Sequence, residues 1–411
     1  MNQSSCRKVG IWIAGVHGDI SATLIVGALA LTKGLTSQAG LTSELPPMNQ
    51  LPLATPDNLV FGGIDISDAS LVDTAESLYR TSRTVPRELL DAVAEELTAI
   101  NEDILVNSNF RWNPTGPNPG LPTLSELADE ISSGISAFRD RHSLSHVVVV
   151  NLTSSEPEPE ISSQHATFEG LQTLINENRK DQISPGILYS YAALSEGCSY
   201  LNFTPNHGTT LGGIRELANQ RNLPFYGNDG KTGETLVKTA LAPMFAFRNL
   251  QVLSWEGVNM LGNNDGKALN QPANRVAKLR NKGNVLENIL GYEPHSGVDI
   301  NYVPSLGDWK TAWDLIHFQG FLDVKMSMQF TWQGCDSILA APLVLDMVRF
   351  SEFAARNGEA GPMRHLASFF KDPMDVPEMA LHTQFERLLK YTEKHLSSQR
   401  TATAKRLNQA G

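Results

Sequence analysis

The chain has 411 residues, of which 41% are hydrophobic and 19% charged, with 32 glycines and 22 prolines. This length predicts two domains, and the composition is typical of a soluble globular protein. The formal net charge of −11 argues against nucleic acid as a partner, because no broad basic surface is available to neutralise phosphates. A local basic pocket for a small anion stays compatible with this charge.

The cysteine and hydropathy patterns favour a cytoplasmic protein. The three cysteines, Cys6, Cys198 and Cys335, have no ligand-like spacing, which indicates reduced thiols. Residues 9–31 are apolar enough to be mistaken for a membrane span. However, a His-Gly-Asp sequence at positions 17–19 interrupts the run, so we expect neither a signal peptide nor a membrane partner.

The first elements indicate a dinucleotide-binding fold. Residues 8–14 form an apolar run typical of a buried parallel strand, and a helical pattern covers 20–31. The turn between them contains Gly15, Val16, His17 and Gly18, although the full GxGxxG pattern is absent. After a long loop, 36–56, a second strand at 59–66 ends with Asp65. An acid at this position normally binds the cofactor ribose and favours NAD over NADP.

Further strands and helices alternate along the first half. Helical patterns cover 88–106, 124–139 and 187–196, and strands are predicted at 146–152 and 200–204. The strand at 146–152 delivers Thr153 and Ser154 to its carboxyl end, where ligands bind in open α/β sheets.

The second half has a different character. Alternating patterns predict strands at 251–259, 298–303 and 324–332, separated by helices at 275–290 and 309–318. A long apolar helix follows at 338–355, and the polar tail 393–411 is expected to be frayed.

The sequence PFYGNDGKTGET at 224–235 is the strongest local signal. It places Asp229, Lys231 and small or hydroxyl residues on a glycine-rich turn before a helical pattern at 236–247. A helix N-terminus with neighbouring hydroxyls can bind a phosphate, and the acid and amine could perform acid–base chemistry beside it. An ordinary strand–turn–helix connection is the alternative.

Several lysines downstream could serve an anionic substrate. Lys278 and Lys282 lie four residues apart on a predicted helix and would project from one face. Lys310 follows Gly-Asp-Trp, and Lys371 follows two phenylalanines. Each lysine alone is compatible with a solvated surface.

Taken together, these motifs identify a resemblance. From residue 8 to residue 373 the chain resembles the myo-inositol-1-phosphate synthases, particularly the shorter bacterial and archaeal type. The matching motifs, in similar order and spacing, are GNDGKTGET at 227–235, LGNNDG at 261–266, Lys278 with Lys282, GDWK at 307–310, CDSILAAPLVL at 335–345 and FFK at 369–371.

The resemblance implies an α/β fold with a Rossmann-type NAD-binding domain, residues 1–235 plus 335–411, and an inserted α+β catalytic and tetramerisation domain, residues 236–334. The family converts D-glucose 6-phosphate to 1L-myo-inositol 1-phosphate as a homotetramer. Bound NAD oxidises C5, a proton leaves C6, the enolate attacks the C1 aldehyde and C5 is reduced again. A divalent or a monovalent cation is used in different members, and the sequence assigns no metal ligands.

The resemblance also implies residue roles. The catalytic residues are Lys278, Lys282, Lys310, Lys371 and Asp229, the last orienting Lys278. The substrate phosphate would be bound by Thr232, Gly233, Glu234 and Thr235. The cofactor-binding residues are Gly15, Val16, His17, Gly18, Asp65, Thr153, Ser154, Asp229, Asn263, Asn264, Asp265, Asp308, Asp336 and Ser337.

Three positions depart from the family pattern. Thr232 replaces a Ser that is common in the eukaryotic type, a mild change for a phosphate-binding hydroxyl. His17 replaces an Arg or Asn at the nucleotide loop. Glu234 stands where the eukaryotic type has Gln, which adds a negative charge near the phosphate unless the side chain points away.

Three functions therefore stay open. The first is an inositol-3-phosphate synthase. The second is a relative that cyclises another hexose phosphate or works as a plain NAD-dependent sugar-phosphate dehydrogenase. The third is an NAD-binding regulatory protein without turnover, against which the complete set of lysines argues.

Overall fold

The computed structural model describes residues 7–112, 116, 118–263 and 285–410, with backbone alone for 402–410. The first half and the C-terminal segment fold around a seven-stranded sheet in the order β3-β2-β1-β4-β5-β6-β11, in which all paired strands are parallel. This order is typical of dinucleotide-binding folds and places the ligand crevice between β1 and β4. The strands are β1 (Val9–Ala14), β2 (Leu59–Asp65), β3 (Ile104–Val106), β4 (His146–Asn151), β5 (Ser199–Asn202), β6 (Pro224–Gly227) and β11 (Gly361–Pro362).

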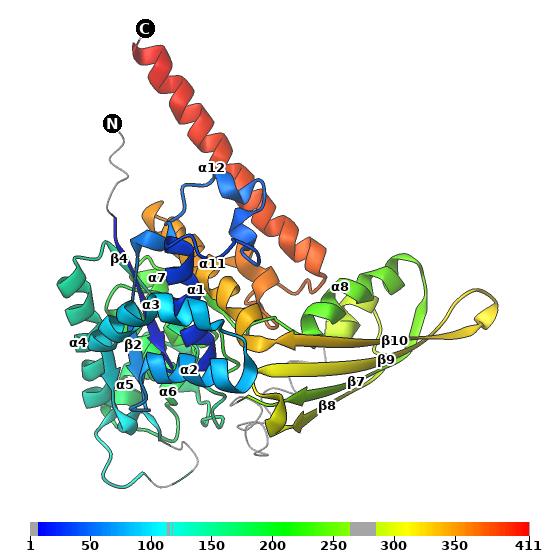
Figure 1. Cartoon of the computed structure of the whole chain (residues 1–411), viewed down its shortest axis with the longest axis horizontal. Helices are drawn as coiled ribbons and strands as arrows, with labels where there is room; N and C mark the ends of the chain where they lie inside the picture. The colour runs from blue at the N-terminus through cyan, green and yellow to red at the C-terminus, as the bar shows by residue number, and fades with distance from the viewer. Residues whose placement is uncertain (1–6, 113–115, 117, 264–284, 411) are drawn as a thin grey trace.

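Helices cover this sheet because its central strands are apolar along their whole length. All six residues of β1 are buried, which requires packing on both faces. The helix α1 packs on α11, which also contacts β4, β5 and β6, while α4 packs on α6 and contacts β1 and β2 (Figure 1). The helices of this part are α1 (Asp19–Thr32), α2 (Leu71–Ser82), α3 (Arg87–Ile100), α4 (Leu124–His142), α5 (Phe168–Asn176), α6 (Pro185–Ser195), α7 (Gly212–Gln220), α11 (Asp336–Arg356) and α12 (Leu381–Ala410).

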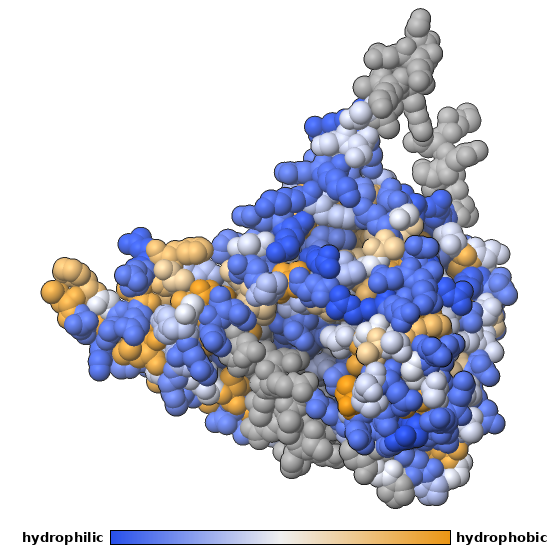
Figure 2. All heavy atoms as spheres, turned by 180° about the vertical axis from the view of Figure 1, so that it is seen from behind, coloured by the Kyte–Doolittle hydropathy of each residue, from blue (hydrophilic) through white to orange (hydrophobic). Residues whose placement is uncertain are grey.

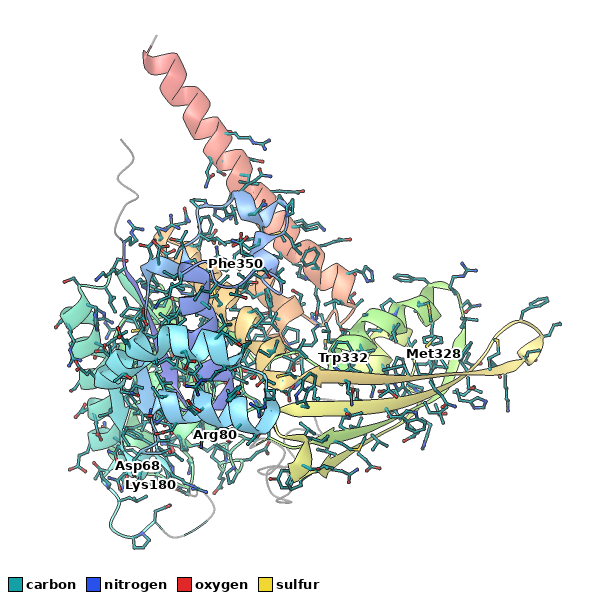
Figure 3. All side chains as sticks on the ribbon, viewed as in Figure 1. Asp68, Arg80, Lys180, Met328, Trp332 and Phe350 are labelled. Atoms are coloured by element: carbon teal, nitrogen blue, oxygen red, sulfur yellow. The ribbon has the colours of Figure 1, made fainter. Side chains whose placement is uncertain are left out.

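A second sheet projects from the first body (Figure 1). Its order is β10-β9-β7-β8, with β7 parallel to β8 and antiparallel to β9. Its strands are β7 (Gln251–Leu261), β8 (His295–Tyr302), β9 (Trp309–Gln319) and β10 (Lys325–Cys335). The helix α8 (Glu234–Phe247) covers one face through a small core that includes Phe245, Trp255 and Ile316. Met328 of β10 packs against this core. Figure 3 labels Met328 and Trp332, both on β10.

Most predicted elements are confirmed, including the strands at 8–14, 59–66, 146–152, 251–259, 298–303 and 324–332 and the helices at 20–31, 124–139 and 338–355. The α/β fold class with a Rossmann-type sheet is likewise confirmed. Of the helix predicted at 275–290, residues 285–290 are helical and the others lie outside the described residues.

Three predictions were wrong. Residues 309–318 form the strand β9 rather than a helix, and its buried positions alternate. The helix predicted for 88–106 ends at Ile100 as α3, and residues 104–106 pair with β2 as β3. The tail is helical, since α12 continues to Ala410 and extends away from the body (Figure 1). Within the described part of the chain, no helix is both long and apolar enough to cross a membrane.

Candidate active site

One cleft lies between the carboxyl edge of the parallel sheet and the second sheet. It combines residues that are far apart in sequence, from the loop after β6, from β7 and β9, from the start of α11 and from the segment before α12. Nine residues predicted for the site line it, namely Asp229, Thr232, Gly233, Glu234, Thr235, Asn263, Lys310, Asp336 and Lys371. Four others, Lys278, Lys282, Asn264 and Asp265, lie outside the described residues.

The predicted phosphate loop leads directly into a helix N-terminus. The helix α8 begins at Glu234, two residues earlier than the sequence pattern predicts, and Gly233 occupies the N-cap position without a side-chain cap. The first N–H groups of a helix have no partner within the helix, so this turn presents backbone donors to the cleft. Thr232 and Thr235 add hydroxyls on either side and are largely buried. The geometry suits a phosphate or another small anion.

Lys371 and Asp229 form an ion pair that joins two distant segments. The Lys371 ammonium donates to the Asp229 carboxylate at 2.8 Å, and the two side chains are only 13% and 6% exposed. The backbone supports the pair, because the Lys371 N–H donates to the Asp229 carbonyl at 2.7 Å and Gly230 bridges to Phe370. The cleft therefore contains an amine whose position is fixed by a carboxylate, as proton transfer requires.

Lys310 reaches the same cleft from β9. Its ammonium is paired with the carboxylate of Asp336, the first residue of α11. Thr232 donates its hydroxyl to the same carboxylate oxygen at 3.2 Å, and the amide of Asn263 donates to the other oxygen at 3.4 Å. This cluster connects the phosphate loop with both sheets.

The structure shows how the negative charge of Glu234 is compensated. Its carboxylate is paired with Lys238 at 2.6 Å and accepts a hydrogen bond from the Asn259 amide at 2.5 Å. All three side chains are buried. Lys238 and Asn259 are not among the site residues predicted from the sequence. The i,i+4 spacing of Glu234 and Lys238 was a readable signal, whereas the contact with β7 was not.

A buried group lies behind the cleft. Asp308 accepts hydrogen bonds from the hydroxyl and N–H of Ser337 and from the Cys335 thiol, and burial raises the pKa of Asp308. Burial together with Asp308 raises the pKa of Cys335 to about 12, so this thiol is neutral and is no nucleophile. Burial also raises the pKa of Asp19, at the start of α1, to about 6, and the charge of Asp308 adds to that shift.

The predicted nucleotide loop, residues 15–18, packs closely against the residues that follow β4. Gly15 has a φ of +85°, and a β-carbon there would lie 3.0 Å from the Leu152 carbonyl group. The N–H of His17 and that of Ser67 donate to the Asp65 carboxylate, both at 2.9 Å. The His17 ring hydrogen-bonds to the Ser67 carbonyl at 3.0 Å, so it is positioned against this turn. Gly18, which follows Val16 and His17, is the N-cap residue of α1 and leaves its N-terminus open for a pyrophosphate.

Asparagines support the neighbouring loop at the end of β4. Asn151 accepts hydrogen bonds from the N–H and hydroxyl of Thr153, and Asn206 donates to Thr153 and to the Ser154 carbonyl. The next carboxylate, Glu156, has its pKa raised to about 7 by burial. These contacts place Thr153 and Ser154 beside the nucleotide loop, at the sheet edge where such cofactors bind.

The fold and the cleft together are those of an NAD-binding α/β enzyme, with a glycine turn at a helix N-terminus and a fixed lysine–carboxylate pair. The chain belongs to the myo-inositol-1-phosphate synthase family, whose model matches residues 9–392. It is 32% identical to inositol-3-phosphate synthase 1 of Bacteroides thetaiotaomicron over 95% of both chains. It is also 32% identical to inositol-3-phosphate synthase of Trypanosoma brucei brucei, over 86% of this chain and 74% of that protein.

The fold likewise resembles a solved structure of inositol-3-phosphate synthase from Caenorhabditis elegans. The TM-score is 0.83 at 24% identity, covering 94% of this chain and 86% of the other. The match to the family confirms the resemblance identified in the sequence, and it confirms NAD as the cofactor.

Proposed function

We propose that this chain is an inositol-3-phosphate synthase that converts D-glucose 6-phosphate to 1L-myo-inositol 1-phosphate. The observation that supports it best is the convergence of the Lys371–Asp229 pair, Lys310 and the phosphate loop in one cleft beside the nucleotide-binding edge. NAD, when bound, supplies the oxidation at C5 and its later reversal, so the reaction has no net redox change.

The residues of the cleft have distinct proposed roles. Thr232, Gly233, Glu234 and Thr235 bind the phosphate through backbone N–H groups and hydroxyls, which fixes the sugar. Lys310, together with Lys282, stabilises the phosphate and the negative charge that develops on O1 during ring closure.

Proton transfer requires amines near C5 and C6. We assign Lys371 and Lys278 to proton movement and charge at O5, with Asp229 as their carboxylate partner. Among the described residues Asp229 is paired with Lys371 at 2.8 Å, while Lys278 lies outside them. The C6–H bond loses its proton, C6 forms the new bond to C1, and the C1 oxygen receives a proton.

Two sets of residues are proposed to hold NAD. The pyrophosphate and adenosine side comprises Gly15, Val16, His17, Gly18 and Asp65, and the loop with Thr153 and Ser154 lies next to it. The residues assigned to the nicotinamide side are Asp229, Asn263, Asn264, Asp265, Asp308, Asp336 and Ser337, with Asp308 and Ser337 forming its buried support.

One incubation separates the proposed reaction from its alternatives. The protein is mixed with glucose 6-phosphate and NAD⁺, the product is identified by NMR, and NADH is followed by absorbance. Inositol phosphate without accumulation of NADH supports the synthase. Stoichiometric NADH would instead indicate a sugar-phosphate dehydrogenase, and NAD binding without turnover a regulatory protein.

We also propose a cytoplasmic homotetramer assembled through the inserted unit 236–334. Its β9–β10 hairpin carries strongly exposed apolar side chains, with Phe321 90%, Leu322 77% and Val324 53% exposed. Figure 2 shows these orange surfaces at the projecting end of the molecule. An exposed apolar patch on a projecting sheet is typical of a subunit interface.

We propose to test whether the activity requires a cation, and we assign no residues as its ligands. Among the described residues there is no group of three or more His, Cys, Asp or Glu side chains that could hold a metal ion. Activity in excess chelator decides the question, because full activity there would contradict a divalent requirement.

A further inference from the structure

The Asp336 carboxylate accepts hydrogen bonds from the same donors that the phosphate of the substrate needs. Its carboxylate is paired with the Lys310 ammonium and accepts the Thr232 hydroxyl at 3.2 Å. The Lys310 ammonium lies directly over the phosphate loop, because a β-carbon on Gly233 would be 2.4 Å from its nitrogen. The pair is mostly buried, with 11% of the Lys310 side chain and 15% of the Asp336 side chain exposed.

A carboxylate and a phosphate place similar demands on these groups. Both accept hydrogen bonds from ammonium and hydroxyl donors, and both are favoured at helix N-termini. Asp336 is the first residue of α11, and the expected phosphate position is at the first turn of α8. The two anions therefore compete for Lys310 and Thr232.

We propose that Asp336 is a specificity-determining residue that competes with the substrate phosphate for Lys310 and Thr232. The identity of the anion as a sugar phosphate rests on the proposed function. A simple anion such as inorganic phosphate gains only Lys310 and the donors of the phosphate loop, and it binds weakly against the internal carboxylate. A sugar phosphate gains further contacts through its hydroxyl groups, which offset the loss of the Asp336 contacts.

Removing the Asp336 carboxylate should strengthen the binding of phosphate. Asp336→Asn keeps the size of the side chain but leaves the Lys310 ammonium mostly buried without its counter-ion, which is unfavourable. A bound phosphate would relieve this cost. We expect inorganic phosphate to bind the Asp336→Asn variant at least about tenfold more tightly than the parent protein. A tenfold change in affinity corresponds to only ~1.4 kcal/mol of binding free energy.

The test is a calorimetric titration of the full-length protein with inorganic phosphate, performed with and without saturating NAD. Lys310→Met should weaken phosphate binding, and in the double variant Asp336→Asn should no longer increase it. Asp323→Asn removes the same charge from the exposed end of the β9–β10 hairpin and is the matched control. A second variant, Asp336→Ser, repeats the test if Asp336→Asn folds poorly.

The outcomes separate this inference from the proposed function. Tighter phosphate binding by Asp336→Asn that depends on Lys310 supports it, even if glucose 6-phosphate proves not to be the substrate. Unchanged or weaker binding, an equal gain in Asp323→Asn, or no phosphate binding by any form would overturn it. The double variant excludes a general loss of structure, because such a loss would not depend on Lys310.

Discussion

Gly233 and Lys310 are in such close contact that a side chain at position 233 would push the end of the lysine side chain aside. A β-carbon there would lie 2.4 Å from both Cε and Nζ of Lys310. The glycine therefore leaves the space through which the end of a lysine from β9 crosses the turn at the start of α8. This contact connects the two sheets at the point where the phosphate is expected.

Gly233→Val should accordingly weaken glucose 6-phosphate binding by tenfold or more, because it displaces Lys310 and crowds the anion. NAD binding should change little, since the nucleotide loop belongs to other segments. Calorimetry with each ligand measures both effects. Gly27→Ala, where an added β-carbon meets nothing within 4 Å, is the control. Unaltered sugar-phosphate affinity in Gly233→Val would mean that this turn is only a helix cap.

Lys278→Ala should reduce product formation about a hundredfold or more while NAD still binds. Lys278 lies outside the described residues, so this prediction depends on the family match and on its spacing from Lys282. Single-turnover assays with NMR detection of inositol phosphate provide the measurement. Near-normal turnover would remove Lys278 from the mechanism.

The sequence predicted the nucleotide-binding half well because its strands are buried on both faces. β1 and β4 read as continuous apolar runs, which no amphipathic helix resembles. β9 was misread for the opposite reason. Its buried face carries Lys310 and Asp314, so the alternation of apolar residues is broken where the strand enters the site.

The site was predictable as a set of motifs but not as a set of contacts. Nothing local indicates that Lys371 meets Asp229, 142 positions earlier in the chain, or that Asn259 meets Glu234. These contacts depend on how the second sheet and the segment before α12 pack onto the first sheet. Of the site contacts among the described residues, the Glu234–Lys238 pair lies within one helical turn and could be read from spacing.

Lys231 should make stability depend on pH. Its ammonium nitrogen is buried against Gln384, and burial lowers the pKa of Lys231 to about 7. The unfolded chain binds this proton up to about pH 10.4, so between pH 7 and 10 it holds more protons than the folded protein. Stability therefore rises with pH across this window, by at most ~1.4 kcal/mol per pH unit.

Lys231→Met should remove the free-energy cost of burying this amine. The variant should therefore be more stable than the parent protein, with the largest difference at pH 7. Thermal unfolding of both proteins at pH 7, 8 and 9 measures it, and the difference in Tm should shrink as the pH rises. Lys180, whose pKa burial also lowers and which is not among the residues that line the cleft, offers Lys180→Met as a comparison. A constant difference in Tm would show that Lys231 does not titrate in this range.

The exposed β9–β10 hairpin should control assembly. Phe321→Ser, which removes the most exposed of its apolar side chains, should weaken the tetramer and shift it toward smaller species at micromolar concentration. Light scattering gives the mass directly. Leu45→Ser, at an exposed leucine outside the inserted unit, should leave the mass unchanged. A stable monomer in the parent protein would refute the proposed tetramer itself.

The Lys371–Asp229 pair should behave as one catalytic unit. Lys371→Met removes the amine, and Asp229→Asn removes the charge that holds it at 2.8 Å, so each should lower kcat about a hundredfold with a smaller effect on KM. Because both changes disable the same function, the double variant should lose little more than either single variant. Losses that multiply in the double variant would show two independent roles and contradict the pairing. NAD affinity, measured by calorimetry on each variant, separates lost chemistry from lost cofactor binding, a control that matters for Asp229 because it is also predicted to bind the cofactor.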